Sequence, residues 1–356
     1  MKTSTSETET SETSTGETAT GETATGEPSS AGADEAAAQR PRWRALVSAW
    51  LIALAALAPP AAMLLARWHW ALDAWTSFPI HALLALLVAT AWAAWLRVRS
   101  AAIVAGVAAI VVGMFAWSER GSGPVATDRP TLKVMSANVL SSNTQTDAFE
   151  GLIRADPPDV LAVLEVNGRW AMALNNLVDI YPHRVPLPRA DNFGLMVLSR
   201  KPIEMVPVRL DDETDSAGAT PSIEIRVPLG ASTVRVLTTH PVPPVGTDNW
   251  RLRNEQLAQV ARFAQRSTAP LVVMGDLNTP PWSPAFRDLI DQSELSDARM
   301  RGNGWSTTWN ARRFWMRTPI DYVLTSPELT AVSYRTQRIP GSDHLAVRAN
   351  IALTEE

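Results

Sequence analysis

The chain shows three different patterns of hydrophobic and polar positions along its length. Residues 1–39 consist almost only of Thr, Ser, Glu, Gly and Ala and contain no aromatic residue. Such a composition offers too little apolar surface to offset the entropy lost on folding, so it predicts a disordered tail. Residues 45–117 hold three long apolar runs, and short apolar runs alternate with polar turns from residue 131 onward. A Gly/Ser/Pro-rich linker at 118–130 separates these last two parts.

The three apolar runs, at about 45–66, 80–96 and 101–117, have the length and composition of membrane-crossing helices. The first contains no charged residue, and the other two carry Trp near their ends, where interfacial anchors belong. A buried helical hairpin of a soluble domain is the alternative. Three such runs in succession favour a membrane anchor over residues 40–117.

Arginines beside these runs predict their orientation. Three of them, at positions 40, 42 and 44, precede the first run, and Arg97 and Arg99 occupy the turn between the second and third. Because loops rich in Lys and Arg favour the cytoplasmic side, we expect a multi-pass protein of the plasma membrane with a cytoplasmic N-terminus. The part after residue 118 is then extracytoplasmic, and the absence of cysteine from the sequence does not conflict with this.

Residues 131–353 combine short β-like runs of mixed length with two helical patterns, at 144–155 and 249–266. Strands interleaved with few helices predict an α/β or α+β domain with packed sheets. The whole chain has a net charge of −4 at pH 7, whereas a nuclease of long duplexes more often carries a basic face.

One loop, residues 299–317, is rich in arginine and aromatic residues and contains no acidic residue. It is either a solvated loop anchored by tryptophan or a contact for an anionic substrate or membrane headgroup. On the second interpretation, the candidate substrate-binding residues are Trp309, Arg312 and Arg313.

Polar side chains collect where the apolar runs of this domain begin or end. Each of them alone is well explained as a strand-end residue that caps a turn. Together they are almost all carboxylates, carboxamides and imidazoles, which predicts a metal–phosphate site if the strand ends converge. The residues are Asn138, Glu165, His240, Asp276, Asn278, Asp321, Asp343 and His344.

Phosphate-ester hydrolysis requires this set of groups. A hard cation neutralises the phosphate oxygens, and Glu165 and Asn138 offer oxygen ligands suited to Mg²⁺ or Mn²⁺. Asp276 is placed to deprotonate the attacking water, and Asn278 to hold that carboxylate or the phosphate. A histidine paired with a carboxylate, as predicted for His344 with Asp321, donates to the developing negative charge.

The motifs SAN138, LAVLE165, FGLMVLSR, TTH240, GDLN278, PIDYVLTS and GSDH344 resemble, in order and style, those of the endonuclease/exonuclease/phosphatase superfamily. The resemblance covers about residues 131–353. It implies a four-layer sandwich with two packed mixed β-sheets, here preceded by three transmembrane helices, and divalent-metal phosphoesterase chemistry. It also implies that Asp343 supports the metal or the phosphate. His240 matches the second histidine of the deoxyribonuclease and sphingomyelinase branches, which helps to protonate the leaving group.

Repair nucleases of this superfamily commonly carry Asp where this chain has Leu140, which argues against abasic-site repair. Three N-terminal spans followed by this domain resemble a membrane-bound bacterial subgroup associated with glycopeptide resistance, for which undecaprenyl phosphate or diphosphate is the implied substrate. We therefore expect an extracytoplasmic phosphoesterase acting on a lipid-linked or headgroup phosphate. The expected partners are the bilayer and the phosphorylated substrate, and no protein partner is predicted. The alternatives are a nuclease acting on DNA or RNA, a non-catalytic binding module, and an enzyme for soluble phosphate esters.

Overall fold

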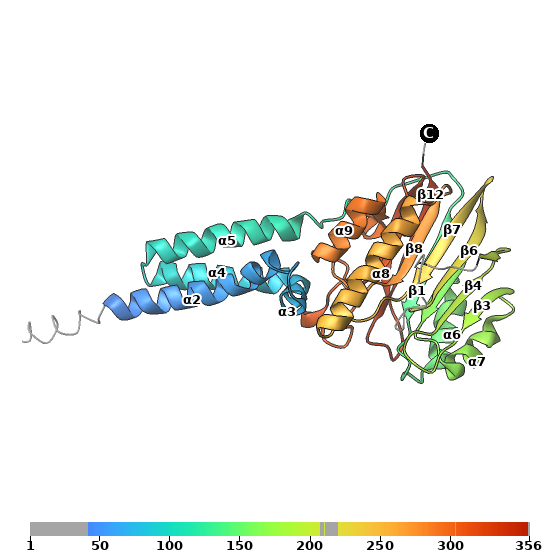
Figure 1. Ribbon diagram of the computed structural model, residues 1–356, viewed down its shortest axis with the longest axis horizontal. Coiled ribbons are helices and arrows are strands. Elements are labelled where there is room, and N and C mark those ends of the chain that lie inside the picture. Colours follow the sequence, from blue (N-terminus) through green and yellow to red (C-terminus); the bar gives the residue numbers. More distant parts are fainter. Residues whose placement is uncertain (1–41, 207–209, 211–219, 303, 355–356) are drawn as a thin grey trace, which may run out of the picture. The chain divides into compact units, whose positions relative to one another are not determined.

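The structure, a computed structural model shown in Figure 1, describes most of the chain after the N-terminal tail. The predicted disordered tail lies outside the described residues. Those described are 42–206, 210, 220–302 and 304–354.

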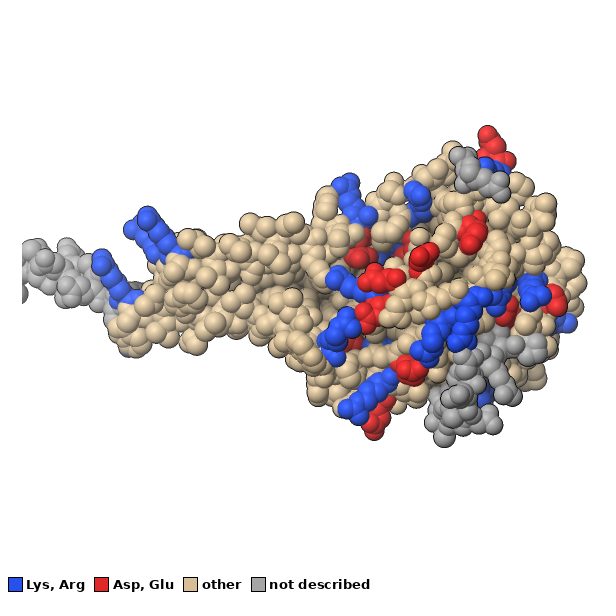
Figure 2. All heavy atoms as spheres, turned by 45° about the horizontal axis from the view of Figure 1, so that its top comes forward, with Lys and Arg blue, Asp and Glu red and all other residues tan. Residues whose placement is uncertain are grey.

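Three helices cover the predicted apolar runs: α2 (Arg42–Leu64), α4 (Pro79–Trp95) and α5 (Arg99–Trp117). Their buried positions are mostly alanines about one helical turn apart, such as Ala49 and Ala53. Large apolar side chains face outward instead, and Val88 and Ile103 are 66% and 64% exposed. Small residues inside and large apolar residues outside are typical of helices that pack together in lipid. On the face shown in Figure 2, charges of both signs cover the sheet domain, and charges on the helical part lie only near its ends.

Two of the predicted spans, α2 and α5, are long and apolar enough to cross a membrane. Helix α4 has 17 residues, which at about 1.5 Å per residue is shorter than a bilayer core of about 30 Å. It qualifies only together with Trp70–Ser77, from which it is bent by 80°. The structure therefore supports two spans, and a third only if this bent pair is one span.

Residues 66–78, which lie between α2 and α4 and are here called the interhelical segment, contain two short helices. These are α3 (Trp70–Asp73) and the 3₁₀ helix η1 (Ala74–Ser77). His69 caps α3, because its Nδ1 accepts a hydrogen bond from the backbone N–H of Ala71.

The described part of the chain after residue 131 contains two six-stranded sheets, in the orders β11-β12-β1-β2-β4-β3 and β5-β6-β7-β8-β10-β9. Both are mixed, since β1 and β2 pair in parallel, as do β7 and β8, while the other pairs are antiparallel. The strands are β1 (Leu132–Asn138), β2 (Val160–Leu164), β3 (His183–Leu187), β4 (Leu195–Ser199), β5 (Glu204–Val206), β6 (Ser222–Leu229), β7 (Ser232–Thr239), β8 (Leu271–Asp276), β9 (Ser296–Asp297), β10 (Asp321–Thr325), β11 (Leu329–Arg338) and β12 (Leu345–Leu353).

The sheets pack face to face through one shared core, in which Val134 and Ala162 of the first sheet join Val272 and Val323 of the second. A second core lies between the first sheet and two helices, α6 (Thr146–Ala155) and α7 (Gly168–Leu174). A third lies between the second sheet and α8 (Thr247–Gln265) and α9 (Pro284–Ser293). The layers run helix, sheet, sheet, helix, so the expectation of two packed mixed sheets is confirmed.

Candidate active site

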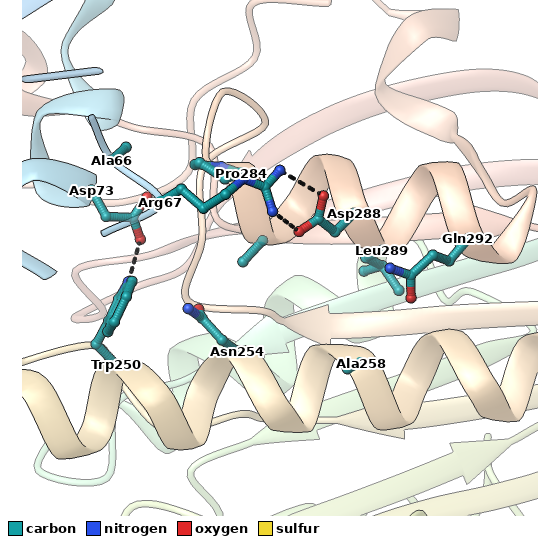
Figure 3. A pocket seen from close by; sticks show the side chains of 11 residues that line it. Ala66, Arg67, Asp73, Trp250, Asn254, Ala258, Pro284, Asp288, Leu289 and Gln292 are labelled. Carbon is teal, nitrogen blue, oxygen red and sulfur yellow. Dashed lines mark hydrogen bonds and ion pairs between the residues drawn. The ribbon is translucent and has the colours of Figure 1, made fainter. Parts of the chain in front are cut away.

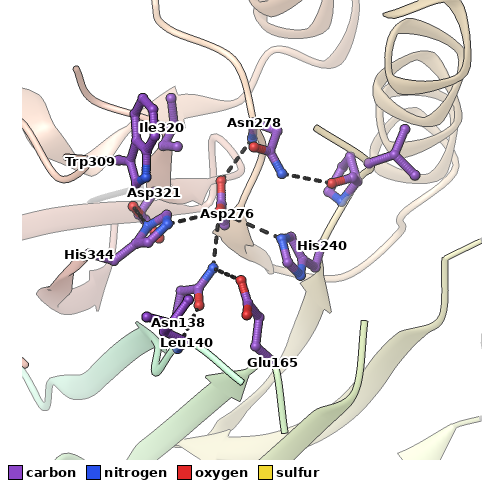
Figure 4. Close-up of polar contacts among 12 residues, drawn as sticks. Asn138, Leu140, Glu165, His240, Asp276, Asn278, Trp309, Ile320, Asp321 and His344 are labelled. Atoms are coloured by element: carbon purple, nitrogen blue, oxygen red, sulfur yellow. Dashed lines mark hydrogen bonds and ion pairs between the residues drawn. The ribbon is translucent and has the colours of Figure 1, made fainter. Parts of the chain in front are cut away.

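The strand directions bring the predicted site residues to one edge of the paired sheets. The carboxyl ends of parallel strands β1 and β2 lie beside the start of antiparallel β12, and those of β7 and β8 lie beside the start of β10. Asp321 and Asp276 are direct partners in this register. Figure 4 shows the side chains of Asn138 and Glu165 pointing from the first sheet towards Asp276 of the second.

Asp276 is the centre of this cluster. Its Oδ2 accepts a hydrogen bond of 3.2 Å from Asn138 Nδ2, and its Oδ1 accepts one of 2.9 Å from the backbone N–H of Asn278. His240 Nε2 and His344 Nε2 lie 3.6 and 3.7 Å from Oδ2. Burial acts to raise the pKa of Asp276, but the two imidazoles and the backbone N–H of Asn278 hold it below its ordinary value. The side chain is therefore a carboxylate at neutral pH.

His344 lies between two carboxylates. Its Nδ1 donates a 2.9 Å hydrogen bond to Asp321 Oδ2, and its Nε2 faces Asp276. Burial acts to lower the pKa of His344, but the charges of Asp321 and Asp276 outweigh it and raise the pKa to about 10. The imidazole is then protonated at neutral pH and presents a donor at Nε2.

Several backbone positions around the cluster are unusual. Leu140, Glu165 and Asn278 have φ values of 64°, 63° and 49°, a region that costs non-glycine residues on the order of 1–3 kcal/mol and is enriched at functional sites. Gly275 is required by a close approach, since a Cβ there would lie 1.9 Å from the carbonyl oxygen of Thr239. This glycine lets β8 place Asp276 beside His240.

Two further carboxylates, Glu165 and Asp343, line the same cavity as Asp276 and offer oxygen atoms suited to a divalent cation. Glu165 accepts hydrogen bonds from Asn138 Nδ2 at 3.0 Å and from the backbone N–H of Ser141 at 2.9 Å. Asp343 Oδ2 accepts from Trp309 Nε1 at 3.1 Å, while its Oδ1 is buried with no hydrogen-bond partner among the described residues. A buried carboxylate oxygen without a donor is what a hard cation would complete, so the donor set fits Mg²⁺ or Mn²⁺.

A different trio also meets the distance requirement for a metal site, since ligand atoms of Asp276, Asp321 and His344 all lie within 4.8 Å of one another. Within this trio, His344 Nδ1 and Asp321 Oδ2 form a 2.9 Å hydrogen bond, and Asp321 Oδ1 is buried with no partner among the described residues. Glu165, Asn138 and Asp343 form a second candidate set of oxygen ligands, in which Asn138 is hydrogen-bonded to Glu165 and Asp343 lines the same cavity as Glu165.

A cavity of about 750 Å³ opens over the cluster. Trp309 lines it, whereas Arg312 and Arg313 are exposed and are not among its lining residues. The guanidinium of Arg312 donates instead to the carbonyl of Gly341 at 2.9 Å. Of the three predicted substrate contacts, the structure thus brings only Trp309 to the cavity.

The interhelical segment, which no sequence motif indicated, also contributes to this cavity. Trp70, Asp73, Ala74 and Ser77 line the cavity, and Asp73 accepts a 2.6 Å hydrogen bond from Arg253, a fully buried residue of α8. A signal was present, because Arg253 lies on the helix face of Leu257 and Val260, where an apolar side chain is expected.

The fold and the cluster define a class of enzyme, the metal-dependent hydrolases of phosphate esters. A family model described as Endonuclease/Exonuclease/phosphatase family matches residues 135–344. The chain belongs to this family, and its members act on phosphate esters with the help of divalent metals.

Comparisons with individual proteins support the same fold. The chain is 29% identical over 140 residues to Protein angel homolog 2 from Danio rerio, covering 38% of this chain and 21% of that protein. The matched region therefore spans about a fifth of that relative. An endonuclease/exonuclease/phosphatase from Beutenbergia cavernae is 24% identical, with a TM-score of 0.51 over 63% of this chain and 72% of the other. A humanized D. rerio TDP2 is 15% identical, with a TM-score of 0.50 over 62% and 98%.

Proposed function

We propose that the chain is a membrane-anchored phosphoesterase that hydrolyses the phosphate ester or diphosphate of a lipid-linked or headgroup substrate. One observation carries this proposal: the interhelical segment, which joins two apolar helices, forms a wall of the cavity above Asp276. A cavity walled by such a segment lies where the phosphate of an amphiphile would be presented. The organisation that follows is an anchor at 40–117, a linker at 118–130 and a catalytic domain at 131–353.

The orientation of the proposed anchor follows from its charges. Arg42, Arg44, Arg97 and Arg99 lie at the starts of α2 and α5 or in the turn before α5. The opposite ends of these helices, namely the ends of α2 and α5 and the start of α4, lie in segments that contact the sheet domain. One such contact is the hydrogen bond between His81 and the Trp315 carbonyl. With the arginines in the cytoplasm, the catalytic domain is extracytoplasmic.

The chemistry we propose assigns a role to each group in the cluster. Asp276, held as a carboxylate, orients the attacking water and accepts its proton. His344, fixed by Asp321, donates to the charge that develops on the phosphoryl oxygens. His240, on the other side of Asp276, protonates the leaving oxygen, and Asn278 holds the Asp276 carboxylate through its backbone N–H.

A divalent cation held by Glu165, Asn138 and Asp343 would neutralise the non-bridging oxygens of the substrate and lower the pKa of bound water. The polar part of the cavity thus binds and activates the phosphate group.

Apolar surface beside the cluster supports an amphiphilic substrate. Trp70, Val242, Pro243 and Val245 line the same cavity as the catalytic residues. Nearby, Phe314 and Trp315 are 75% and 57% exposed and line a second cavity with the first residues of α4. Exposed aromatics beside an arginine-rich loop are typical of surfaces that meet lipid headgroups.

A nuclease is the second candidate. Arg312 and Arg313 are exposed in a loop that also carries Phe314 and Trp315, and such groups can contact the backbone and stack on the bases of single strands. The two functions are separated by assaying the full-length protein in detergent with Mg²⁺ on undecaprenyl diphosphate and on plasmid DNA. Phosphate release without nicking, lost in Asp276→Asn, supports the lipid phosphatase. Nicking that is lost in the same variant, without phosphate release, supports the nuclease.

A further inference from the structure

The interhelical segment is tied to the catalytic loop by a buried network centred on Asp73. One carboxylate oxygen of Asp73 accepts hydrogen bonds from Arg253 Nη2 at 2.6 Å and Trp250 Nε1 at 3.1 Å. The other accepts from Ser283 Oγ at 2.8 Å. Both Asp73 and Arg253 are buried, so the pair is screened little by solvent. Figure 3 shows Asp73 directed at Trp250 on α8.

Arg253 continues this network into the active site. Its Nη1 donates a 2.7 Å hydrogen bond to the backbone carbonyl of Asn278. The backbone N–H of Asn278 donates to Asp276 Oδ1. The side-chain Nδ2 of Asn278 donates to the carbonyl of Pro241, the residue after His240. Arg253 thus holds Asn278, whose backbone is in the left-handed region. Asn278 in turn contacts both Asp276 and the loop of His240.

We propose that Asp73 is a positioning residue of the catalytic centre, acting through Arg253 on the Asn278 loop. The interhelical segment is then part of the enzyme's active site, in addition to linking two apolar helices. Without the Asp73 carboxylate, the buried guanidinium loses its counter-charge and its fixed orientation, and the Asn278 peptide is released. Asp276 then loses a donor to Oδ1 and its alignment with the attacking water. This inference rests on the proposed catalytic role of the Asp276 cluster.

The chain offers a matched control in the same segment. Arg67 forms an ion pair of 2.7 Å with Asp288 of α9, and their side chains are 60% and 41% exposed. As Figure 3 shows, this pair also joins the interhelical segment to the sheet domain, but neither residue contacts the Asp276 cluster. Asp288→Asn therefore removes an anchor of the segment and leaves the connection to Asn278 intact.

The test measures kcat and KM of the full-length protein in detergent with Mg²⁺ on bis(p-nitrophenyl) phosphate, a small soluble diester. In Asp73→Asn we expect kcat to fall by about 10- to 100-fold, because misplacing catalytic groups by up to about 1 Å has effects of this size. We expect KM to change little and Asp288→Asn to match the wild type. A folded Asp73→Asn variant with wild-type kcat, or an equal fall in Asp288→Asn, would overturn the proposal.

Milder variants keep the test decisive if Asp73→Asn does not fold. Trp250→Phe and Ser283→Ala each remove one neutral donor to Asp73 and keep the ion pair with Arg253. Assayed below their unfolding temperatures, both should lower kcat several-fold, and unchanged kcat in both would contradict the proposal. Because the probe has no lipid tail, the outcome is independent of the lipid preference. A failure of the lipid assay with a persisting Asp73 effect overturns the proposed substrate alone.

Discussion

Asn138 Nδ2 donates a hydrogen bond of 3.2 Å to Asp276 Oδ2, from the end of a central strand of one sheet to the end of a central strand of the other. The same amide donates to Glu165 Oε1 at 3.0 Å. One side chain therefore connects the proposed general base to a proposed metal ligand. Since Glu165 and Asp276 belong to different sheets, the packing of the sheets sets the distance between their carboxylates. The shared core therefore helps to fix the geometry of the proposed active site.

Replacing Asp276 by Asn should lower kcat by about 10² to 10⁴, the usual contribution of a general base. The amide has the shape of the carboxylate, so the fold should be retained, as checked by circular dichroism and thermal unfolding. A matched control is Asp179→Asn, whose carboxylate pairs with Arg154 and lies outside the cavity lining. A folded Asp276→Asn variant with wild-type turnover would remove Asp276 from the mechanism.

Replacing Glu165 by Gln should raise the Mg²⁺ concentration needed for half-maximal activity, because the amide is a weaker ligand for a hard cation. The measurement is a metal titration of activity, with Mg²⁺ binding followed by calorimetry. Glu150→Gln on α6, where Glu150 pairs with Arg154, should behave like the wild type. An unchanged metal requirement in Glu165→Gln would exclude Glu165 as a ligand.

The stability of the metal-free protein should fall as the pH rises through the range set by His344. Its pKa is about 10 in the folded protein and 6.5 ordinarily. A folded pKa above the unfolded one means that the stabilisation is complete below pH 6.5 and is lost as the pH approaches 10.

Denaturant unfolding in chelator across this range tests the sign of this effect. In Asp321→Asn the decline should be smaller, because the carboxylate that raises the pKa of His344 is gone. A stability that rises with pH over the same interval in the wild type would contradict a protonated, carboxylate-paired His344.

The proposed topology can be tested by cysteine labelling, since the natural sequence contains no cysteine. Val125→Cys places an exposed thiol after the last apolar helix, and Ser100→Cys places one near the turn between α4 and α5. A membrane-impermeant maleimide applied to intact cells should label Cys only in Val125→Cys, and both variants after the membrane is opened. The opposite labelling would reverse the orientation of the catalytic domain.

Strand-end chemistry made the main cluster predictable from the sequence. Residues such as Glu165 and Asp276 directly follow short apolar runs, and the direction of parallel strands brings such positions to one edge. The core-facing helix α7 was missed because its seven residues give few turns in which a period of 3.6 can be recognised. Helix α9 was missed because it begins at the last residue of the proline-rich run PPWSP (residues 280–284), which is typical of a loop.

The contact between Asp73 and Arg253 was also beyond sequence reasoning, since the two residues are 180 positions apart in the chain and belong to parts of different composition. For Arg312 and Arg313, their charge and their aromatic neighbours indicated a substrate contact. The sequence did not indicate whether these side chains face the cavity. The structure places both on the surface outside the cavity lining.

The most direct test of the lipid-phosphoesterase proposal compares two substrates that share a diphosphate head and differ in chain length. Full-length protein in detergent with Mg²⁺ is given undecaprenyl diphosphate or a short, soluble isoprenyl diphosphate, and kcat/KM is measured from phosphate release. Because apolar residues of the interhelical segment line the cavity, we predict a kcat/KM at least about tenfold higher for the long chain, the effect of roughly 1.4 kcal/mol of apolar contact. Equal values for both chains, or nicking of plasmid DNA in place of phosphate release, would contradict the proposed function.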